Sequence, residues 1–132
     1  MDNLSITCKS VGKTRFCATV RGHETYCDVT PDRGGDDTAM LPPEALAAAL
    51  GNCLGMVIAL TCRHKEIPYE GMEVNVSCTF EDDGARCDNF RCEVKMPQPL
   101  DDRQRKIVEG ACHLCKVGNT LTHGAKVEEV II

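Results

Sequence analysis

One long, almost uninterrupted apolar stretch, residues 43–64, limits the folds open to this chain more than any other feature. Pro42 and Pro43 stand at its start, which suits the first turn of a helix, where a missing N–H costs no hydrogen bond. Glu44 would then face the positive end of the helix dipole, and basic residues close the stretch at the negative end. The sequence therefore predicts a helix over 43–64, and a helix that is apolar on nearly all sides is either buried or spans a membrane.

A membrane span is the weaker of these two interpretations. The stretch reaches the roughly 20 residues that a span needs, but it is rich in Ala and Gly rather than in Leu, Ile and Phe. The segments on both sides alternate polar and apolar residues as half-buried strands do, and such strands need a helix to cover their apolar face. We therefore expect a buried central helix and no membrane partner.

The length and net charge of the chain indicate a single domain that does not bind nucleic acid. The chain has 132 residues, which suits one domain over 1–132. It carries 15 Lys and Arg against 20 Asp and Glu, a net charge of −5, and it has no Trp. This balance argues against nucleic acid as a partner. The N-terminal residues lack the basic and apolar regions of a secretory signal, so we expect a cytoplasmic protein.

Period-two alternation and turn residues divide the remainder of the chain around the central helix. Short strand-like runs with Gly-containing turns predict an N-terminal β-meander, and a longer alternating pair predicts a half-buried hairpin. The predicted segments are a meander at 1–30, a loop at 31–42, the helix at 43–64, a hairpin at 72–96, a helical segment at 100–121 and a strand at 126–132. This order predicts an α+β fold in which antiparallel sheets wrap a long buried central helix.

Ten cysteines are unusual for a cytoplasmic chain, and most fall on apolar strand positions, where Cys packs as a small hydrophobic residue. Cys53, near the middle of the central helix, and Cys115, on the later helical segment, are candidates for chemistry. A reactive cysteine needs a positive neighbour or a helix N-terminus to stabilise its thiolate. Because Cys53 lies more than two turns into its own helix, we expect an arginine from elsewhere, with Arg33 as the candidate. Glu44 could hold that arginine in a bidentate pair.

The sequence Cys112-His113-Leu114-Cys115 is the one CxxC motif in the chain. A structural zinc site needs four ligands, and no second pair stands at a matching spacing. The motif also does not follow a strand, as a thioredoxin-like dithiol would. We therefore predict no metal and no organic cofactor.

Two motifs resemble the OsmC/Ohr family. The run from Pro43 to Cys53 is similar to the family signature Pro-Glu-x-Leu-x-x-Ala-x-x-x-Cys, and the run from Cys115 to Leu121 is similar to Cys-Pro-Val-x-x-Thr/Val-Leu. They stand in the family's order, about sixty residues apart, and the element order matches over essentially the whole chain. The resemblance implies an OsmC-like fold and an intertwined homodimer with its active sites at the interface.

The resemblance also implies a thiol peroxidase. Cys53 would attack an organic hydroperoxide and become a sulfenic acid, Cys115 would resolve it as a disulfide, and a dithiol reductant would restore both thiols. The family's glutamate falls on Glu44, and its loop arginine falls on Arg33 within a one-residue gap.

The chain departs from the family pattern at Lys116, which replaces the proline after the second cysteine. Cys112 and Cys62 are alternative resolving thiols. A second hypothesis keeps the fold but makes the protein a non-enzymatic module that binds a small apolar or sulfur ligand in the dimer cleft.

Overall fold

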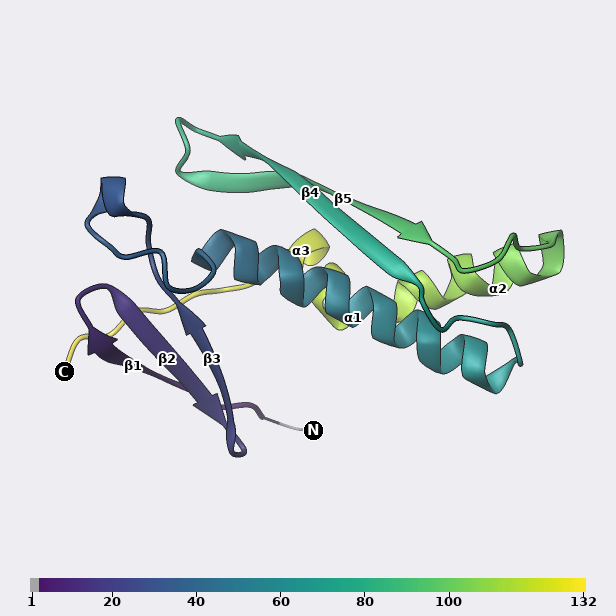
Figure 1. The fold of residues 1–132 in the computed structure, drawn as a ribbon, viewed down its shortest axis with the longest axis horizontal. Helices are drawn as coiled ribbons and strands as arrows, with labels where there is room; N and C mark the ends of the chain where they lie inside the picture. Colours follow the sequence, from purple (N-terminus) through teal and green to yellow (C-terminus); the bar gives the residue numbers. More distant parts are fainter. Residues whose placement is uncertain (1–2) are drawn as a thin grey trace. The chain divides into compact units, whose positions relative to one another are not determined.

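The computed structural model describes residues 3–132, and its chain divides into two compact units (Figure 1). The first unit runs up to Leu46 and the second from Ala47 to the C-terminus. Each unit is described by itself below.

The first unit contains the predicted β-meander. Its strands are β1 (Thr7–Gly12), β2 (Arg15–Val20) and β3 (His23–Cys27), which pair antiparallel in the order β1-β2-β3. The tight turns between them need left-handed backbone, and Lys13 (φ 32°) and Gly22 (φ 83°) supply it. The expectation of three short antiparallel strands is confirmed.

The loop after β3 is held by one buried carboxylate. Asp28, only 3% exposed, accepts hydrogen bonds from the Thr14 hydroxyl (2.6 Å), the Val29 N–H (2.8 Å) and both the N–H (3.1 Å) and hydroxyl (2.8 Å) of Thr38. These donors hold the pKa of Asp28 well below its usual range. The loop, which includes a short 3-10 helix η1 (Pro31–Arg33), is therefore tied to the turn between β1 and β2.

Helix α1 (Pro42–His64) has the predicted bounds to within one residue. It is the one helix of residues 3–132 that is long and apolar enough to cross a membrane, by length and composition alone. The core helix of a water-soluble protein passes the same test, and Ile58 and Cys62 of α1 are fully buried inside the protein.

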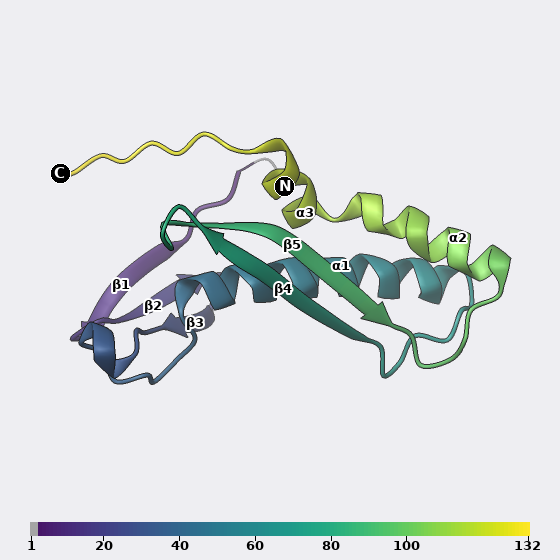
Figure 2. The same cartoon turned by 90° about the horizontal axis from the view of Figure 1, so that it is seen from above.

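The hairpin of β4 (Glu73–Glu81) and β5 (Arg86–Lys95) lies along α1 in the second unit (Figures 1 and 2). Burial alternates as predicted over most of the hairpin, with Val74 and Val76 packed against the core cluster. Beyond the bulge between Ser77 and Thr79 the alternation breaks, and Phe80 is 59% exposed. The approach is close where α1 has glycine: a Cβ built on Gly51 would lie 2.9 Å from Cγ2 of Val76, and one on Gly55 would lie 3.5 Å from Cγ2 of Val74. The hairpin therefore packs against the α1 backbone at positions where glycine has no Cβ to obstruct it.

The helical segment predicted over 100–121 is three pieces rather than one. These are α2 (Asp102–Ala111), a 3-10 turn η2 (Cys112–Leu114) and α3 (Lys116–His123). Asp101 caps α2 in a reciprocal capping box with Gln104. Cys115 breaks the segment because its backbone is extended (φ −73°, ψ 106°), so α3 begins a new helix with its own N-terminus.

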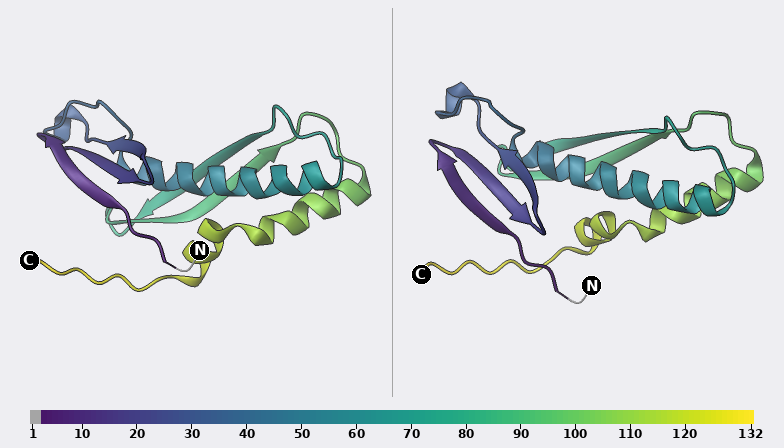
Figure 3. Two further views of the ribbon diagram at one scale, coloured as in Figure 1. Left: turned by 90° about the horizontal axis from the view of Figure 1, so that it is seen from below. Right: turned by 60° about the horizontal axis from the view of Figure 1, so that its bottom comes forward.

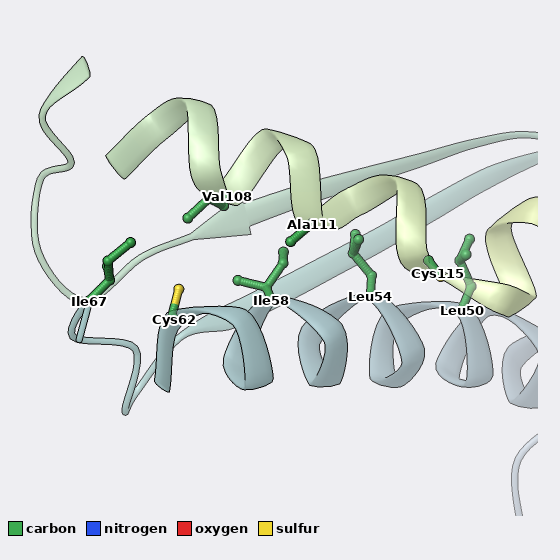
Figure 4. Packing of buried hydrophobic residues seen from close by; sticks show 8 residues of the cluster. All are labelled: Leu50, Leu54, Ile58, Cys62, Ile67, Val108, Ala111 and Cys115. Atoms are coloured by element: carbon green, nitrogen blue, oxygen red, sulfur yellow. The ribbon is translucent and has the colours of Figure 1, made fainter. Parts of the chain in front are cut away.

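The core of the second unit lies between α1 and the α2–α3 segment. Figure 4 shows a row of α1 side chains pointing toward residues of that segment. The buried cluster consists of Leu50, Leu54, Ile58, Cys62, Ile67, Val108, Ala111 and Cys115. Two of its eight members, Cys62 and Cys115, are cysteines, so thiols serve here as core side chains. Of the ten cysteines only these two and Cys17 are buried, fewer than the sequence analysis expected.

The strand predicted over 126–132 is not formed. Residues 124–132 are neither helix nor strand and form the yellow C-terminal tail of Figure 3. The side chains of Val127 and Ile131 are 82% and 98% exposed. A strand exists only through hydrogen bonds to a neighbouring strand. Within the described residues, no strand pairs with this apolar tail.

Candidate functional site

Cys53 lies at the edge of the packed side of α1. The α1 positions Leu50 and Leu54 beside it are buried, whereas Asn52 and Met56 are exposed, and Cys53 itself is half-buried. A thiol at such a border is held in a defined place by packing and yet can be reached from solvent. This combination suits a reactive cysteine better than full burial does.

The N-terminus of α3 faces the Cys53 sulfur. The N–H of Val117 donates toward this sulfur and is the strongest influence lowering the pKa of Cys53. Burial raises the pKa of Cys53 and so opposes this effect. The Cys115 thiol, the Lys116 N–H and the Lys116 charge lower this pKa, as Val117 does. Free N–H groups at the start of a helix stabilise an anion because they have no partner within the helix.

The start of α3 is therefore a source of thiolate stabilisation that the sequence analysis did not expect, while the expected role of Arg33 stays a prediction. The dipole of its own helix does little there, but a second helix supplies an N-terminus. The sequence analysis placed Lys116 and Val117 inside one helical segment over 100–121, whereas they begin a separate helix. Lys116 and Val117 are thus site residues that the sequence analysis missed.

Cys115 stands beside Cys53 as the N-cap of α3. Its sulfur accepts a hydrogen bond from the N–H of Gly118 at 3.3 Å, and its side chain is buried, with 3% exposed. Burial raises the pKa of Cys115, and the neighbouring Cys53 raises it further. The two thiols therefore differ: Cys53 ionises first, and Cys115 remains a protonated donor to it.

Arg33 and Glu44 belong to the first unit, and the structure does not pair them with each other. Arg33 is exposed at the end of η1, and none of the four ion pairs found among residues 3–132 includes it. Glu44 accepts a hydrogen bond from the N–H of Leu41 at 2.8 Å, so its carboxylate satisfies a free donor at the start of α1. Within one unit, the structure brings together only Cys53 and Cys115 of the four predicted residues.

The alternative resolving thiols are engaged elsewhere. Cys112 donates to the carbonyl of Val108 at 3.4 Å, and burial raises its pKa, with smaller contributions from the charges of Glu109 and Cys92. Cys62 is fully buried, which raises its pKa as well, and it lies nine residues beyond Cys53 on α1. Nine residues are about 13 Å of helix rise, too far for a disulfide.

No group of three or more His, Cys, Asp or Glu side chains able to hold a metal ion occurs in the part of the chain that the structure describes. The site consists of two thiols and the backbone N–H groups of a helix start. Such a set can stabilise a thiolate, accept an oxygen atom on sulfur and close a disulfide.

Comparison with solved structures identifies the fold. The protein resembles a proposed osmotic stress induced and detoxification response protein from Psychrobacter arcticus (TM-score 0.80, 24% identity, 91% of this chain and 89% of that chain). It also resembles an OsmC-like protein from Mycoplasma pneumoniae (TM-score 0.77, 19% identity, 92% and 89%). A third similar structure is the organic hydroperoxide resistance protein OhrB of Bacillus subtilis (TM-score 0.58, 17% identity, 89% and 90%).

No curated protein sequence matches the chain. A family model described as OsmC-like protein matches residues 34–130, which include both cysteine motifs and most of the chain. The α+β architecture with antiparallel sheets and the fold of the solved structures agree with this match. The chain belongs to the OsmC-like protein family.

Proposed function

We propose that the protein is a thiol peroxidase that reduces organic hydroperoxides with Cys53 as the nucleophile and Cys115 as the resolving thiol. The observation that carries this proposal is the placement of a half-buried thiol at the N-terminus of α3, next to a second, protonated thiol. Similar structures from Legionella pneumophila, Elizabethkingia anophelis and Bacillus subtilis are named organic hydroperoxide resistance proteins, which supports the substrate class.

In the first step, the Cys53 thiolate attacks the terminal oxygen of the hydroperoxide and breaks the O–O bond. Cys53 becomes a sulfenic acid, and the alkoxide leaves as an alcohol after taking a proton from the adjacent Cys115 thiol. The reaction oxidises one sulfur by two electrons and reduces one peroxide. The N–H groups of Lys116 and Val117 hold the attacking sulfur as an anion before the peroxide arrives.

In the second step, the Cys115 thiolate attacks the sulfur of the sulfenic acid. The S–S bond forms as the S–O bond breaks, and the released hydroxide takes a proton from solvent to become water. A dithiol reductant then returns both cysteines to thiols by two exchange reactions. Because Cys115 is buried, this reductant is expected to attack at the more exposed Cys53 sulfur.

The roles of Arg33 and Glu44 follow from the family resemblance. We propose that Arg33 binds and orients the hydroperoxide and that Glu44 positions Arg33, in addition to its bond with the Leu41 N–H. An Arg33→Gln variant should lose peroxidase rate while Cys53 still reacts with a small alkylating reagent. Equal rates for the variant and the wild type would remove Arg33 from the mechanism.

We propose that the protein works as a homodimer in the cytoplasm. Two exposed apolar regions support association: Met56 (63% exposed) and Leu60 (61% exposed) on α1, and the tail that includes Val127 and Ile131. A second copy would cover the first and offer the tail a strand to pair with. Light scattering coupled to gel filtration should give twice the mass of the chain.

The test is mass spectrometry after one equivalent of cumene hydroperoxide is added to fully reduced protein. We expect a loss of two hydrogens that maps to a Cys53–Cys115 disulfide. In Cys115→Ser, the sulfenic acid at Cys53 should persist and react with dimedone. The matched control is Cys112→Ser, three residues away on the same segment, which should still form the disulfide.

A Cys53–Cys112 bond would preserve the activity and reassign the resolving thiol. Absence of selective oxidation at Cys53 would contradict the proposal altogether. In that case, the hypothesis of a module that binds a small apolar or sulfur ligand would replace it.

A further inference from the structure

A cavity of about 520 Å³ opens where β5 ends and the chain turns into α2 (Figure 2). The end of β5, the segment 97–100, α2 and Cys112 line it, so it lies wholly within the second unit. Sites for small molecules have volumes of about 300–1,000 Å³. Neither Cys53 nor Cys115 lines the cavity, which is therefore a candidate site separate from the thiol pair.

Much of the wall of this cavity is apolar. Val94, Met96 and Leu100 line it together with Val108 of α2, which is buried. Cys112 lines it as well, and burial raises the pKa of its thiol, which indicates poor hydration at this part of the wall. A ligand that fills the cavity gains most by having an apolar body.

Two opposite charges also line the cavity, Arg105 and Glu109, which are exposed on α2. None of the four ion pairs found among residues 3–132 includes either of them. They are four residues apart, and a base that precedes an acid by four residues is the less favourable order for an ion pair on a helix. Both charges are therefore available to a ligand that carries a carboxylate and an ammonium group.

We propose that this cavity binds an apolar dipeptide, with its carboxylate on Arg105, its ammonium group on Glu109 and its side chains against the apolar wall. The guanidinium of an arginine offers two parallel N–H donors that match a carboxylate. Arg105 and Glu109 are separated by about 6 Å of helix rise.

The length of the ligand follows from this separation. The charged ends of an extended dipeptide lie about 6 Å apart, whereas those of a single amino acid lie about 2.5 Å apart. A fatty acid would leave Glu109 without a partner and would bring a like charge near it. The pair of charges therefore favours a dipeptide over both alternatives.

The experiment is isothermal titration calorimetry of the reduced full-length protein with leucyl-leucine as the probe. We expect saturable binding of one dipeptide per chain. N-acetyl-leucyl-leucine lacks the ammonium group and leucyl-leucine amide lacks the carboxylate, so each should bind about three- to tenfold more weakly. Glycylglycine keeps both charges but lacks the apolar side chains, and it should bind more than about tenfold more weakly.

Two substitutions test which charge holds which end of the dipeptide. Arg105→Gln should weaken leucyl-leucine by about three- to tenfold and leave the affinity for leucyl-leucine amide unchanged. Glu109→Gln should weaken leucyl-leucine to the same degree and leave the affinity for N-acetyl-leucyl-leucine unchanged. The matched control is Arg103→Gln, because Arg103 is exposed on the same helix but does not line the cavity.

The position of the bound dipeptide is checked by the alkylation rate of each thiol with N-ethylmaleimide, followed by mass spectrometry. Leucyl-leucine should slow the reaction at Cys112 and leave that at Cys8 unchanged. Absence of saturable binding, tighter binding of a fatty acid of similar length, or an affinity that neither substitution changes would overturn the proposal. Cys53→Ser should bind the dipeptide as the wild type does, so the result does not depend on whether the protein reduces hydroperoxides.

Discussion

Two glycines of α1 offer a quantitative test of how the β4–β5 hairpin packs on the helix. Both lie in the helix interior, where replacing Gly by Ala gains about 1 kcal/mol of helix propensity. They differ in what a new Cβ would meet. At Gly55, the atom would lie at an ordinary contact distance of 3.5 Å from Val74, whereas at Gly51 it would lie 2.9 Å from Cγ2 of Val76.

The expected free energies of unfolding follow from this difference. Gly55→Ala should stabilise the protein by up to about 1 kcal/mol. Gly51→Ala has the same gain, but the hairpin must shift, and overpacking costs about 1–3 kcal/mol. The net effect at Gly51 is therefore a loss of about 0–2 kcal/mol, and the two variants should differ by about 1–3 kcal/mol.

Urea denaturation followed by circular dichroism measures both variants under the same conditions. Removing the obstacle should reverse the sign: in a Val76→Ala background, Gly51→Ala should become stabilising. Equal stability of the two glycine variants, or no coupling between Gly51 and Val76, would refute the close approach of the hairpin to α1.

Three further predictions concern stability. Asp28→Asn should destabilise the first unit and reduce the loss of its stability at acid pH. Because folding lowers the pKa of Asp28, its contribution to stability is present at neutral pH and is lost as the pH falls below about 4. Melting curves measured against pH test this, and an unchanged acid dependence would contradict it. Asp101→Ala should cost about 1 kcal/mol through the lost cap of α2, measured by urea titration. Ile58→Ala, at a fully buried position, should cost about 2–5 kcal/mol in the same assay, and a cost below 1 kcal/mol would place Ile58 outside the core.

Much of the fold could be predicted because its signals are local. The prolines, the Glu and the apolar run locate α1 to within one residue, and the alternation of β4 and β5 follows the period of a strand that is covered on one face. The Asp101 cap of α2 is a local feature of the same kind, because an N-cap acts on an N–H only three residues away.

The site was only half predictable. The motifs identified Cys53 and Cys115, but the N–H groups at the start of α3 were missed, because periodicity does not show where one helix ends and the next begins. The extended backbone at Cys115 decides that. It makes residues 116–118, which were expected inside one helical segment, the first turn of α3.

The sequence by itself determined the elements, their order and the two thiols, because propensity, capping and hydrophobic period depend on residues a few positions apart. Only the tertiary structure decided which groups meet across the chain. The N-terminus of α3 reaches a cysteine more than sixty residues earlier, and this distinguishes Cys53 from the other nine thiols. The physical reason is that the pKa of a thiol depends on burial and on neighbouring donors and charges, and folding brings these together from distant parts of the chain.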